Sequence, residues 1–359
     1  MVCPHIPKIS YIEFSNWFHG KCGRARIPVT GAVELTSRCN LRCAHCYIRL
    51  PADSEEARRA ELTLSEWRRI IDEITAEGCL WLCLTGGEPL LRPDFLEIYT
   101  YAKERGHLIS VFTNGTLVTP RIADHLAEFS PFVIEISIYG STRKTYESVT
   151  GVPGSYERCR RGIELLRERG IPLKLKTVVM SLNRHELDEM ENWAAELGLP
   201  FHFDPVLIPR LNGSRQPCTL RLTPEEVVAL DLANEQRAKE WKELMETGRK
   251  FPAEPEDLYY CGAGIGSFHL DFRGELFLCL MARSPGYPIS SGSFREGWNY
   301  LFKARQQKRQ TPSACSRCRL VYLCGQCPGW GLLEHNDPEG KVDYLCQIAL
   351  LREAAFGKG

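Results

Sequence analysis

The chain has 359 residues, of which 43% are hydrophobic, and 45 basic residues balance 45 acidic ones. This length and composition predict a soluble protein with one large domain and a smaller one. The balanced charge gives no electrostatic reason to bind nucleic acid or an anionic membrane, so neither is expected as a partner. No apolar run approaches the roughly 18 residues of a membrane span, and no signal peptide is evident, so we expect a cytoplasmic location.

The first two hundred residues alternate between strand and helix patterns. The expected strands lie at 29–36, 80–87, 108–115, 132–140, 173–181 and 201–208, and the expected helices at 62–78, 93–106, 119–130, 155–170 and 183–198. Such alternation predicts parallel strands joined by right-handed crossovers. Six units are too few for a closed eight-unit barrel, so the pattern predicts an α/β fold, a partial (β/α)6 barrel at 29–210, with its chemistry at the strand C-terminal ends.

Three cysteines follow the first expected strand, in "SRCNLRCAHCY" at 37–47: Cys39, Cys43 and Cys46. In a reducing cytoplasm, clustered cysteines more often bind metal than form disulfides. Three thiolates can each bind one iron of a 4Fe–4S cluster, which leaves the fourth iron open for a substrate or cofactor. The alternative is a zinc site completed by another ligand such as His45. The spacing, with its following aromatic residue, favours iron.

Glycine and polar residues follow the next three expected strands. They are Gly86, Gly87 and Glu88 in "TGGEP", Thr113 and Asn114 in "FTNG", and Ser137 in "SIYG". The glycines allow the backbone to approach a ligand, and the glutamate could bind an ammonium group. The threonine and asparagine could reach ribose hydroxyls. Each segment alone is consistent with an ordinary turn, but together they indicate one binding site.

The rest of the chain differs in pattern from the barrel region. A linker region at 211–258 contains one long expected helix, 223–248. A hairpin at 267–280, a cysteine-dense segment and a terminal helix at 342–356 predict a second domain, 259–359. Residues 1–28 form an N-terminal extension.

The second domain contains seven cysteines, which are Cys261, Cys279, Cys315, Cys318, Cys324, Cys327 and Cys346. A structural zinc ribbon in "CSRCRLVYLCGQC" is one interpretation. Only five residues separate its two cysteine pairs, which is too short for two zinc knuckles, and seven cysteines exceed the ligands of one zinc ion. The pattern therefore favours larger metal clusters.

The sequence resembles the radical S-adenosylmethionine (SAM) superfamily over about residues 29–208, on the motifs "CNLRCAHCY" and "GGEP". The resemblance implies a 4Fe–4S cluster on Cys39, Cys43 and Cys46, with SAM chelated to the open iron. The cluster would cleave SAM reductively to methionine and a 5′-deoxyadenosyl radical, which abstracts a hydrogen atom from the substrate. Tyr47 would lie near the adenine, and the "GGE" residues would hold the methionyl end.

The chain departs from the superfamily pattern at two positions. Related maturases have an aspartate in "SxDG" and an arginine farther along, where this chain has Tyr139 and Val149. Lys176 is the expected substitute for that arginine at the SAM carboxylate. It shares a strand face with Lys174, and a charge inside a barrel needs an anionic partner. A solvated lysine at a strand end is the alternative.

The second cysteine set is similar to the SPASM domain, which extends radical SAM enzymes and binds two auxiliary 4Fe–4S clusters. The resemblance implies an outer cluster on Cys315, Cys318, Cys324 and Cys346, and an inner cluster on Cys261, Cys279 and Cys327. A fourth inner cysteine is not evident; Cys218 is a candidate, and an open iron is the other interpretation. Leu280 and Met281 occupy the place of the aspartate base of sulfatase-maturing relatives, which argues against the same oxidation.

The resemblance implies a radical SAM oxidoreductase with a small C-terminal α+β iron–sulfur domain. Its substrate would be a ribosomally made peptide, matured by a thioether, a carbon–carbon crosslink or a backbone modification. We expect a reductant such as flavodoxin or ferredoxin. Only 38 residues precede Cys39, so we also expect a separate leader-peptide-binding protein. The alternatives are action on a tetrapyrrole or pterin precursor, and a non-catalytic iron–sulfur or zinc scaffold.

Overall fold

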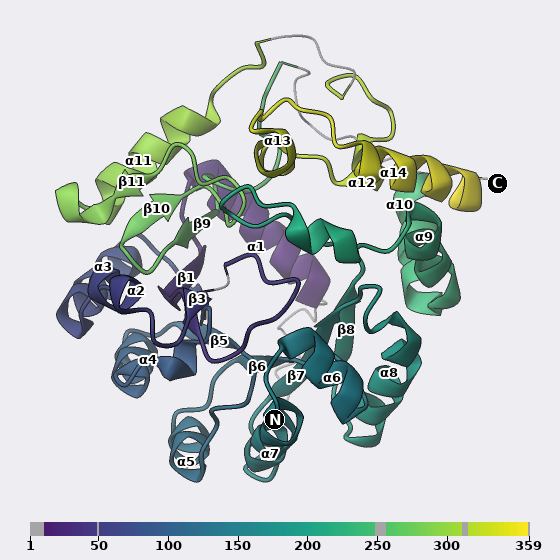
Figure 1. Cartoon of the computed structure of the whole chain (residues 1–359). Helices are drawn as coiled ribbons and strands as arrows, with labels where there is room; N and C mark the ends of the chain where they lie inside the picture. The colour runs from purple at the N-terminus through teal and green to yellow at the C-terminus, as the bar shows by residue number, and fades with distance from the viewer. Residues whose placement is uncertain (1–10, 49, 248–255, 311–314, 358–359) are drawn as a thin grey trace, which may run out of the picture.

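A curved, mostly parallel sheet forms the centre of the computed structural model, which describes residues 11–48, 50–247, 256–310 and 315–357 (Figure 1). Within these residues the sheet has nine strands, in the order β11-β10-β9-β1-β4-β5-β6-β7-β8. Its six expected strands are β1 (Thr30–Thr36), β4 (Trp81–Gly86), β5 (Leu108–Thr113), β6 (Val133–Ser137), β7 (Leu173–Val178) and β8 (Phe201–Asp204). Neighbours among them pair in parallel. The predicted partial α/β barrel is confirmed.

The crossover helices cover the outer face of this sheet (Figure 1). They are α3 (Leu64–Ala76), α4 (Phe95–Glu104), α5 (Pro120–Glu128), α7 (Ser155–Arg167) and α8 (Leu187–Glu196). A capping box of Thr63 and Glu66 begins α3, as its sequence predicts. The glycines that follow α3, α4 and α7 have φ angles of 88°, 88° and 66°, a left-handed conformation in which glycine ends a helix at little cost.

Alternating side chains divide the sheet into a packed outer face and a half-buried inner face. Leu82, Leu84 and Val111 are buried in the main core against the crossover helices. The alternate residues Cys83 and Phe112 are half-buried, because the inner face lines the barrel instead. The period of two in the strand sequences therefore positions polar side chains inside the barrel.

Several elements near the barrel mouth and base have no counterpart among the expected ones. These are α1 (Tyr11–Ala25), β2 (Arg38–Cys39), β3 (Leu50–Pro51), α2 (Glu55–Ala60), η1 (Pro89–Leu91) and α6 (Arg143–Thr150). The helix expected at 183–198 begins instead with one tighter turn, η2 (Arg184–Glu186), before α8. Helix α1 packs at the start of β4, where the Phe18 and His19 rings lie 5.6 and 5.5 Å from the Trp81 ring. It therefore contacts the end of the barrel opposite to the cysteine loop.

The expected C-terminal hairpin joins the barrel sheet. Strand β9 (Ser267–Leu270) pairs in parallel with β1 and antiparallel with β10 (Glu275–Phe277), which pairs with β11 (Tyr287–Pro288). Gly274, with a φ of 81°, forms the predicted hairpin turn. Because one sheet spans both regions, the expected divisions of the chain at 29, 211 and 259 stay predictions.

The single long helix expected at 223–248 is two helices, so that prediction was wrong. Helices α9 (Pro224–Ala233) and α10 (Glu235–Thr247) separate at Asn234, which has an extended backbone. The Asn234 side chain accepts a hydrogen bond from the Arg237 N–H (3.0 Å) and so caps α10. The helical pattern continued through this cap because no glycine or proline stands between Pro224 and Thr247 to mark a break.

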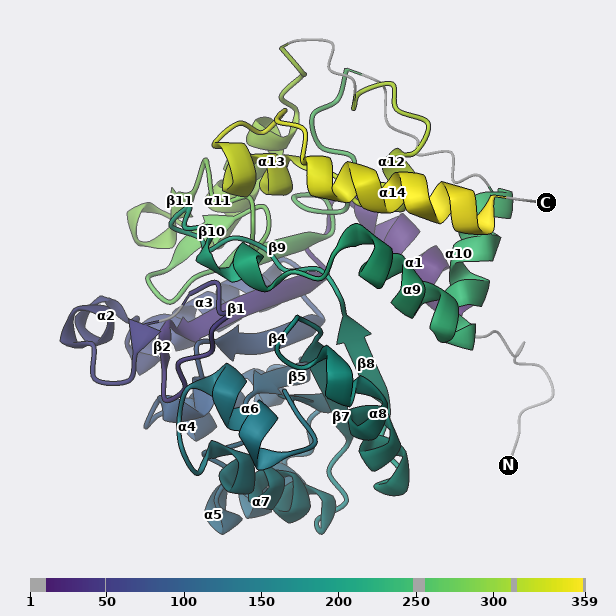
Figure 2. The ribbon, with the colours of Figure 1, turned by 45° about the vertical axis from the view of Figure 1, so that its right-hand side comes forward.

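Short helices complete the C-terminal region, where α14 packs beside α9 and α10 (Figure 2). They are η3 (Gln216–Leu220), η4 (Ile289–Ser291), α11 (Phe294–Arg305), α12 (Val321–Cys324), α13 (Pro328–His335) and α14 (Asp343–Phe356). Helix α14 matches the predicted terminal helix. In the part of the chain that the structure describes, no helix is both long and apolar enough to span a membrane.

Candidate functional site

The loop of the three predicted cluster cysteines rests on the C-terminal end of α6. The N–H groups of Arg42 and Ala44 donate to the carbonyls of Thr150 (2.8 Å) and Val149 (2.9 Å). The last carbonyls of a helix have no partner inside that helix. The loop satisfies two of them, which fixes its backbone over the barrel mouth.

The three thiols of Cys39, Cys43 and Cys46 share one neighbour, Tyr139, at the end of β6. Burial raises the pKa of the Tyr139 hydroxyl, and thiolate charge on each of the three cysteines raises it further. None of these cysteines forms a disulfide within the described residues. Thiols whose charges all act on one hydroxyl lie near one another, which suits a shared iron–sulfur cluster in which each thiolate binds a different iron.

His45, the ligand of the zinc alternative, packs its ring 4.8 Å from the Tyr139 ring. Burial lowers the pKa of His45 to about 4, so its imidazole is neutral near pH 7. Among the residues that the structure describes, no three His, Cys, Asp or Glu side chains gather as ligands of a single metal ion. The geometry therefore adds no support to the zinc alternative.

The glycine turn after β4 packs directly on the start of the cysteine loop. Cβ atoms at Gly86 and Gly87 would lie 2.1 Å and 2.3 Å from the carbonyl oxygens of Thr36 and Arg38. The Gly87 N–H donates to the Thr36 carbonyl (2.7 Å), and the Glu88 N–H donates to the Arg38 carbonyl (2.9 Å). Only glycine allows this approach, which explains the two glycines of the motif.

The side chain of Glu88 is fully buried and joins the turn after β4 to the end of β5. Its carboxylate accepts hydrogen bonds from the Thr113 hydroxyl (2.7 Å), the Asn114 N–H (2.7 Å) and the Leu90 N–H (3.1 Å). Burial raises the pKa of Glu88 to about 7 in spite of these hydrogen bonds. The carboxylate therefore holds two of the predicted site segments together.

Asn114 links the end of β5 to the first cluster cysteine. Its Nδ2 atom lies 3.7 Å from the Cys39 sulfur and donates to the Asn40 side chain (3.0 Å). Its Oδ1 atom accepts from the Thr116 N–H (2.9 Å). The structure therefore places Asn114 against the cysteine loop, and a contact with ribose stays a prediction.

Lys176 lies inside the barrel beside Ser137 of the neighbouring strand. Its Nζ atom is 3.1 Å from the Glu135 carboxylate and 3.0 Å from the centre of the Phe112 ring. Burial lowers the pKa of Lys176, and the charge of Glu135 acts in the opposite direction. The lysine thus has the anionic partner that an interior charge requires, while 22% of its side chain stays exposed, so its role at the SAM carboxylate stays a prediction.

A buried charged group inside the barrel was missed from the sequence. Glu34 on β1 is 1% exposed, and its Oε1 atom lies 2.5 Å from Arg283 Nη2 and 3.2 Å from His269 Nε2. Burial raises the pKa of nearby Tyr47, and the charge of Glu34 raises it further. A glutamate inside the apolar run 29–36 was the available signal, but its partners come from distant segments.

The structure brings the seven C-terminal cysteines together in two groups. Burial raises the pKa of Cys327 to about 11, and thiolate charge on Cys279 and Cys261 adds to this. Burial also raises the pKa of Cys324 to about 11, and thiolate charge on Cys346, Cys315 and Cys318 raises it further. The inner group is Cys261, Cys279 and Cys327, and the outer group is Cys315, Cys318, Cys324 and Cys346.

One side chain ties the segment between Cys324 and Cys327 to the loop before α14. Gln326 donates from Nε2 to the Gly340 carbonyl (3.0 Å) and accepts from the Val342 N–H (3.1 Å). Cys324 belongs to the outer group and Cys327 to the inner group, so Gln326 helps to fix the positions of both cysteines. Cys218, the candidate spare ligand, lies instead near Arg221 and Glu334.

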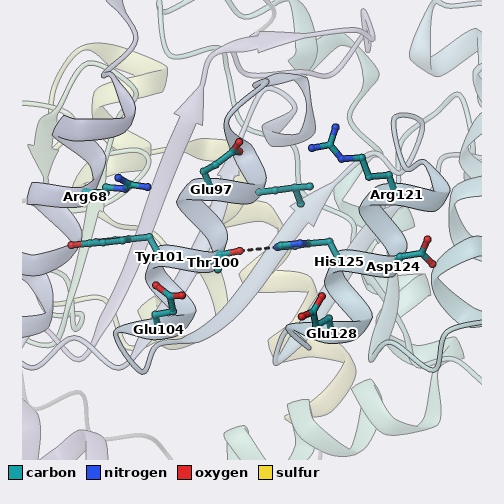
Figure 3. A pocket seen from close by; sticks show the side chains of 10 residues that line it. Arg68, Glu97, Thr100, Tyr101, Glu104, Arg121, Asp124, His125 and Glu128 are labelled. Carbon is teal, nitrogen blue, oxygen red and sulfur yellow. Dashed lines mark hydrogen bonds between the residues drawn. The ribbon is translucent and has the colours of Figure 1, made fainter.

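A groove of about 510 Å³ lies on the outer helical layer between α4 and α5 (Figure 3). The hydrogen bond of Thr100 and His125 (2.7 Å) crosses it, and Glu97, Glu104 and Arg121 lie around it. As the structure describes it, none of the predicted site residues lines this groove. This groove is thus separate from the predicted site around the cysteine loop.

Known proteins resemble the chain in sequence and in fold. The family model of the Radical SAM superfamily matches residues 33–194. The PqqA peptide cyclase of Ruegeria pomeroyi is 35% identical over 356 residues, 92% of each chain. The AdoMet-dependent heme synthase of Methanosarcina barkeri is 29% identical over 325 residues, 82% of this chain and 90% of its own.

A solved structure supports the same architecture. SuiB of Streptococcus suis, bound to its precursor peptide SuiA, matches with a TM-score of 0.69 at 16% identity. The match covers 97% of this chain and 84% of that one. At this identity the likeness concerns the fold alone.

Proposed function

Because this chain belongs to the radical SAM superfamily, we propose that it is an enzyme that modifies a ribosomally made peptide by radical chemistry. The peptide substrate is supported by the PqqA peptide cyclase, which matches over 92% of both chains. The observation that carries the enzymatic role is the gathering of three thiols around Tyr139, on a loop packed against a glycine turn.

Cys39, Cys43 and Cys46 would hold the 4Fe–4S cluster, and SAM would bind beside them. When bound, the cluster and SAM supply a 5′-deoxyadenosyl radical for hydrogen abstraction from the substrate. The chain's own residues prepare this place: α6 holds the loop, and the Asn114 amide lies where it donates to a thiolate sulfur. The neutral imidazole of His45 adds no charge beside the sulfurs.

The residues assigned to SAM are Tyr47 at the adenine, Gly86, Gly87 and Glu88 at the methionyl end, Thr113 and Asn114 at the ribose, Ser137 at the end of β6, and Lys176 at the carboxylate. Support is strongest for the glycine turn, because its close packing brings it beside the first cysteine. Lys176 is paired with Glu135, so a role at the SAM carboxylate requires that Glu135 release it. Val149 is buried in the core and offers no charge in its place.

The inner and outer groups would each hold an auxiliary 4Fe–4S cluster, which accepts or supplies an electron during a net oxidation of the substrate. Their support is that the thiolate charges acting on Cys324 come from Cys346, Cys315 and Cys318, whereas those acting on Cys327 come from Cys279 and Cys261. The inner group has three cysteines, so one of its irons takes another ligand or stays open to the substrate.

Two protein partners follow from this function. A one-electron reductant such as flavodoxin or ferredoxin would reduce the clusters, and a separate leader-peptide-binding protein would present the substrate. A cytoplasmic location, where such reductants occur, completes the proposal.

Action on a tetrapyrrole is the second candidate function. It is favoured by the AdoMet-dependent heme synthase of Methanosarcina barkeri, which is 29% identical over 82% of this chain. The peptide and tetrapyrrole functions differ only in the substrate, because both would use the cysteine loop and the glycine turn in the same way.

Anaerobic assays of the reconstituted protein test the proposal. With SAM and dithionite, we expect formation of 5′-deoxyadenosine, and its absence in protein with full iron loading would refute the enzyme. The rate is then compared with a short peptide encoded beside the gene and with an iron-containing tetrapyrrole. Stimulation by the peptide, with a change in the peptide's mass, supports the maturase; stimulation by the tetrapyrrole alone favours the second candidate.

A further inference from the structure

A buried carboxylate, Glu61, lies between two arginines at the base of the cysteine loop. The side chain of Glu61 is 8% exposed, and those of Arg38 and Arg92 are each 5% exposed. Arg38 donates to the carboxylate from Nε (2.7 Å) and Nη2 (3.0 Å), and Arg92 Nη1 lies 3.6 Å from it. The Thr36 hydroxyl donates to the same carboxylate. One acidic side chain thus joins two separate segments of the chain.

These two segments carry the residues assigned to the cluster and to SAM. Arg38 immediately precedes Cys39, and Arg92 lies four residues after Glu88. The carbonyl of Arg38 also accepts the Glu88 N–H (2.9 Å), while Arg92 donates to the carbonyl of Leu35 (3.1 Å). Glu61 is therefore placed to set the position of the first cysteine relative to the glycine turn.

Arg38 depends on Glu61 more strongly than Arg92 does. Arg92 also pairs with Asp94 at 2.7 Å, whereas the other side-chain bond that the structure gives Arg38 is to the Ala52 carbonyl (3.0 Å). A cavity of about 520 Å³ adjoins both arginines. A buried guanidinium without its carboxylate is unstable and turns toward water. Loss of the Glu61 charge would release Arg38 into this cavity and displace the backbone before the first cysteine.

We infer that Glu61 is a positioning residue, which fixes the first cluster cysteine against the turn that binds SAM. The inference rests on the proposed function, because it takes the loop as the cluster site and the turn as the SAM site. The Glu61 side chain acts on the cysteine through Arg38, both directly and by way of Thr36, so its effect falls on the binding geometry of SAM. The residue lies 15 positions beyond the last cysteine of the loop, Cys46, and is not part of that motif.

The variant Glu61→Gln tests this in reconstituted full-length protein. Uncoupled SAM cleavage with dithionite gives kcat and KM, and electron paramagnetic resonance reports how the reduced cluster responds to SAM. We expect KM for SAM to rise about tenfold or more with a smaller change in kcat, and the spectral response to SAM to weaken. Glu55→Gln is the matched control, because Glu55 forms an exposed pair with Arg58 on the adjacent helix, and it should behave like wild type.

A double variant, Arg38→Gln/Glu61→Gln, separates positioning from stability. It removes both charges, so we expect its Tm to recover toward wild type, while KM stays high because Cys39 has lost its anchor. A wild-type KM and spectral response in Glu61→Gln would overturn the inference, as would recovery of both in the double variant. If the wild-type chain itself binds no cluster or forms no 5′-deoxyadenosine, the proposed function fails instead.

Discussion

The carboxylate of Glu34 lies 2.5 Å from the guanidinium of Arg283, although 249 residues separate them in the chain. Glu34 belongs to β1, which leads into the cysteine loop, and Arg283 lies four residues after Cys279 of the inner group. His269, 3.2 Å from the same carboxylate, completes the contact. This ion pair ties the two cysteine-bearing regions together inside the barrel.

Removal of Arg283 should destabilise the protein. In Arg283→Gln the buried Glu34 keeps only the weaker contact with His269, so we expect the free energy of unfolding to fall by about 1.5–3 kcal/mol. Anaerobic urea unfolding measures this change. Arg295→Gln is the control, because Arg295 is 70% exposed in its pair with Glu77, and such pairs contribute under about 1 kcal/mol. Equal losses in the two variants would contradict the role given to Glu34.

Replacement of a single loop cysteine should remove one cluster. In Cys39→Ala we expect the iron content to fall by about four per chain and 5′-deoxyadenosine formation to stop, because the other two thiols cannot hold a cubane stably. Anaerobic iron and sulfide analysis measures this. Cys159→Ala provides the control, since Cys159 is buried in the core and should leave the iron content unchanged. An unchanged iron content in Cys39→Ala would rule out this loop as a cluster site.

The two C-terminal groups should lose iron independently. Wild-type protein with three cubanes contains about twelve irons per chain, and Cys327→Ala and Cys346→Ala should each remove about four. Because the two cysteines belong to different groups, the double variant should lose about eight. Anaerobic iron and sulfide analysis tests these losses. A double variant that loses no more iron than either single variant would show that both cysteines bind the same cluster.

Glu186 should make stability depend on pH in the acid range. It accepts hydrogen bonds from the Ser141 N–H (2.7 Å), the Thr142 N–H (3.0 Å) and the hydroxyls beside them, at the start of the helix that holds the cysteine loop. Burial would raise the pKa of Glu186, but these hydrogen bonds outweigh it and lower the pKa from 4.5 to about 2. The ionised form therefore stabilises the fold above pH 4.5, and this contribution is lost as the pH falls toward 2.

Comparison with Glu186→Gln isolates this contribution. We expect the variant to be less stable than wild type by about 2–3 kcal/mol at pH 6, with the difference shrinking steadily between pH 4.5 and 2.5. Unfolding in urea at several pH values gives the difference, and other carboxylates cancel between the two proteins. A difference that stays constant with pH would show that Glu186 does not carry this charge effect.

The sequence predicts the central strands and crossover helices because their signals are local. The alternation in β4 and β5 reports which side chains face the core, and the capping box of Thr63 and Glu66 marks the start of α3. Helix α6 was missed although Thr142 caps its start and Gly151 ends it, because its sequence is mostly polar and Glu186 from a later segment also holds its first turn. The break at Asn234 was missed because one side-chain cap decides it.

The residues of the candidate site also divide into those with local sequence signals and those that meet only in the fold. Glycines and cysteines with fixed spacing were recognised from the sequence, because tight turns and shared ligands constrain neighbouring residues. The ion pairs were not predicted, because the fold determines which distant residues meet. Glu135, the partner of Lys176, lies on the next strand, and Glu61, the partner of Arg38, lies beyond the cysteine loop. Charge inside a strand indicates that a partner exists but does not identify it.

The pairing of β9 with β1 has a consequence for dissecting the molecule. Residues 30–33 find their hydrogen-bonding neighbours on one flank in Ser267–Leu270. A chain that stops before the hairpin would leave β1 as an uncovered edge strand, and its unpaired backbone groups would pair with strands of other chains. Such a fragment would aggregate rather than serve as a minimal SAM-cleaving unit, so the region that bears the auxiliary cysteines is a structural requirement of the barrel as well as an addition to it.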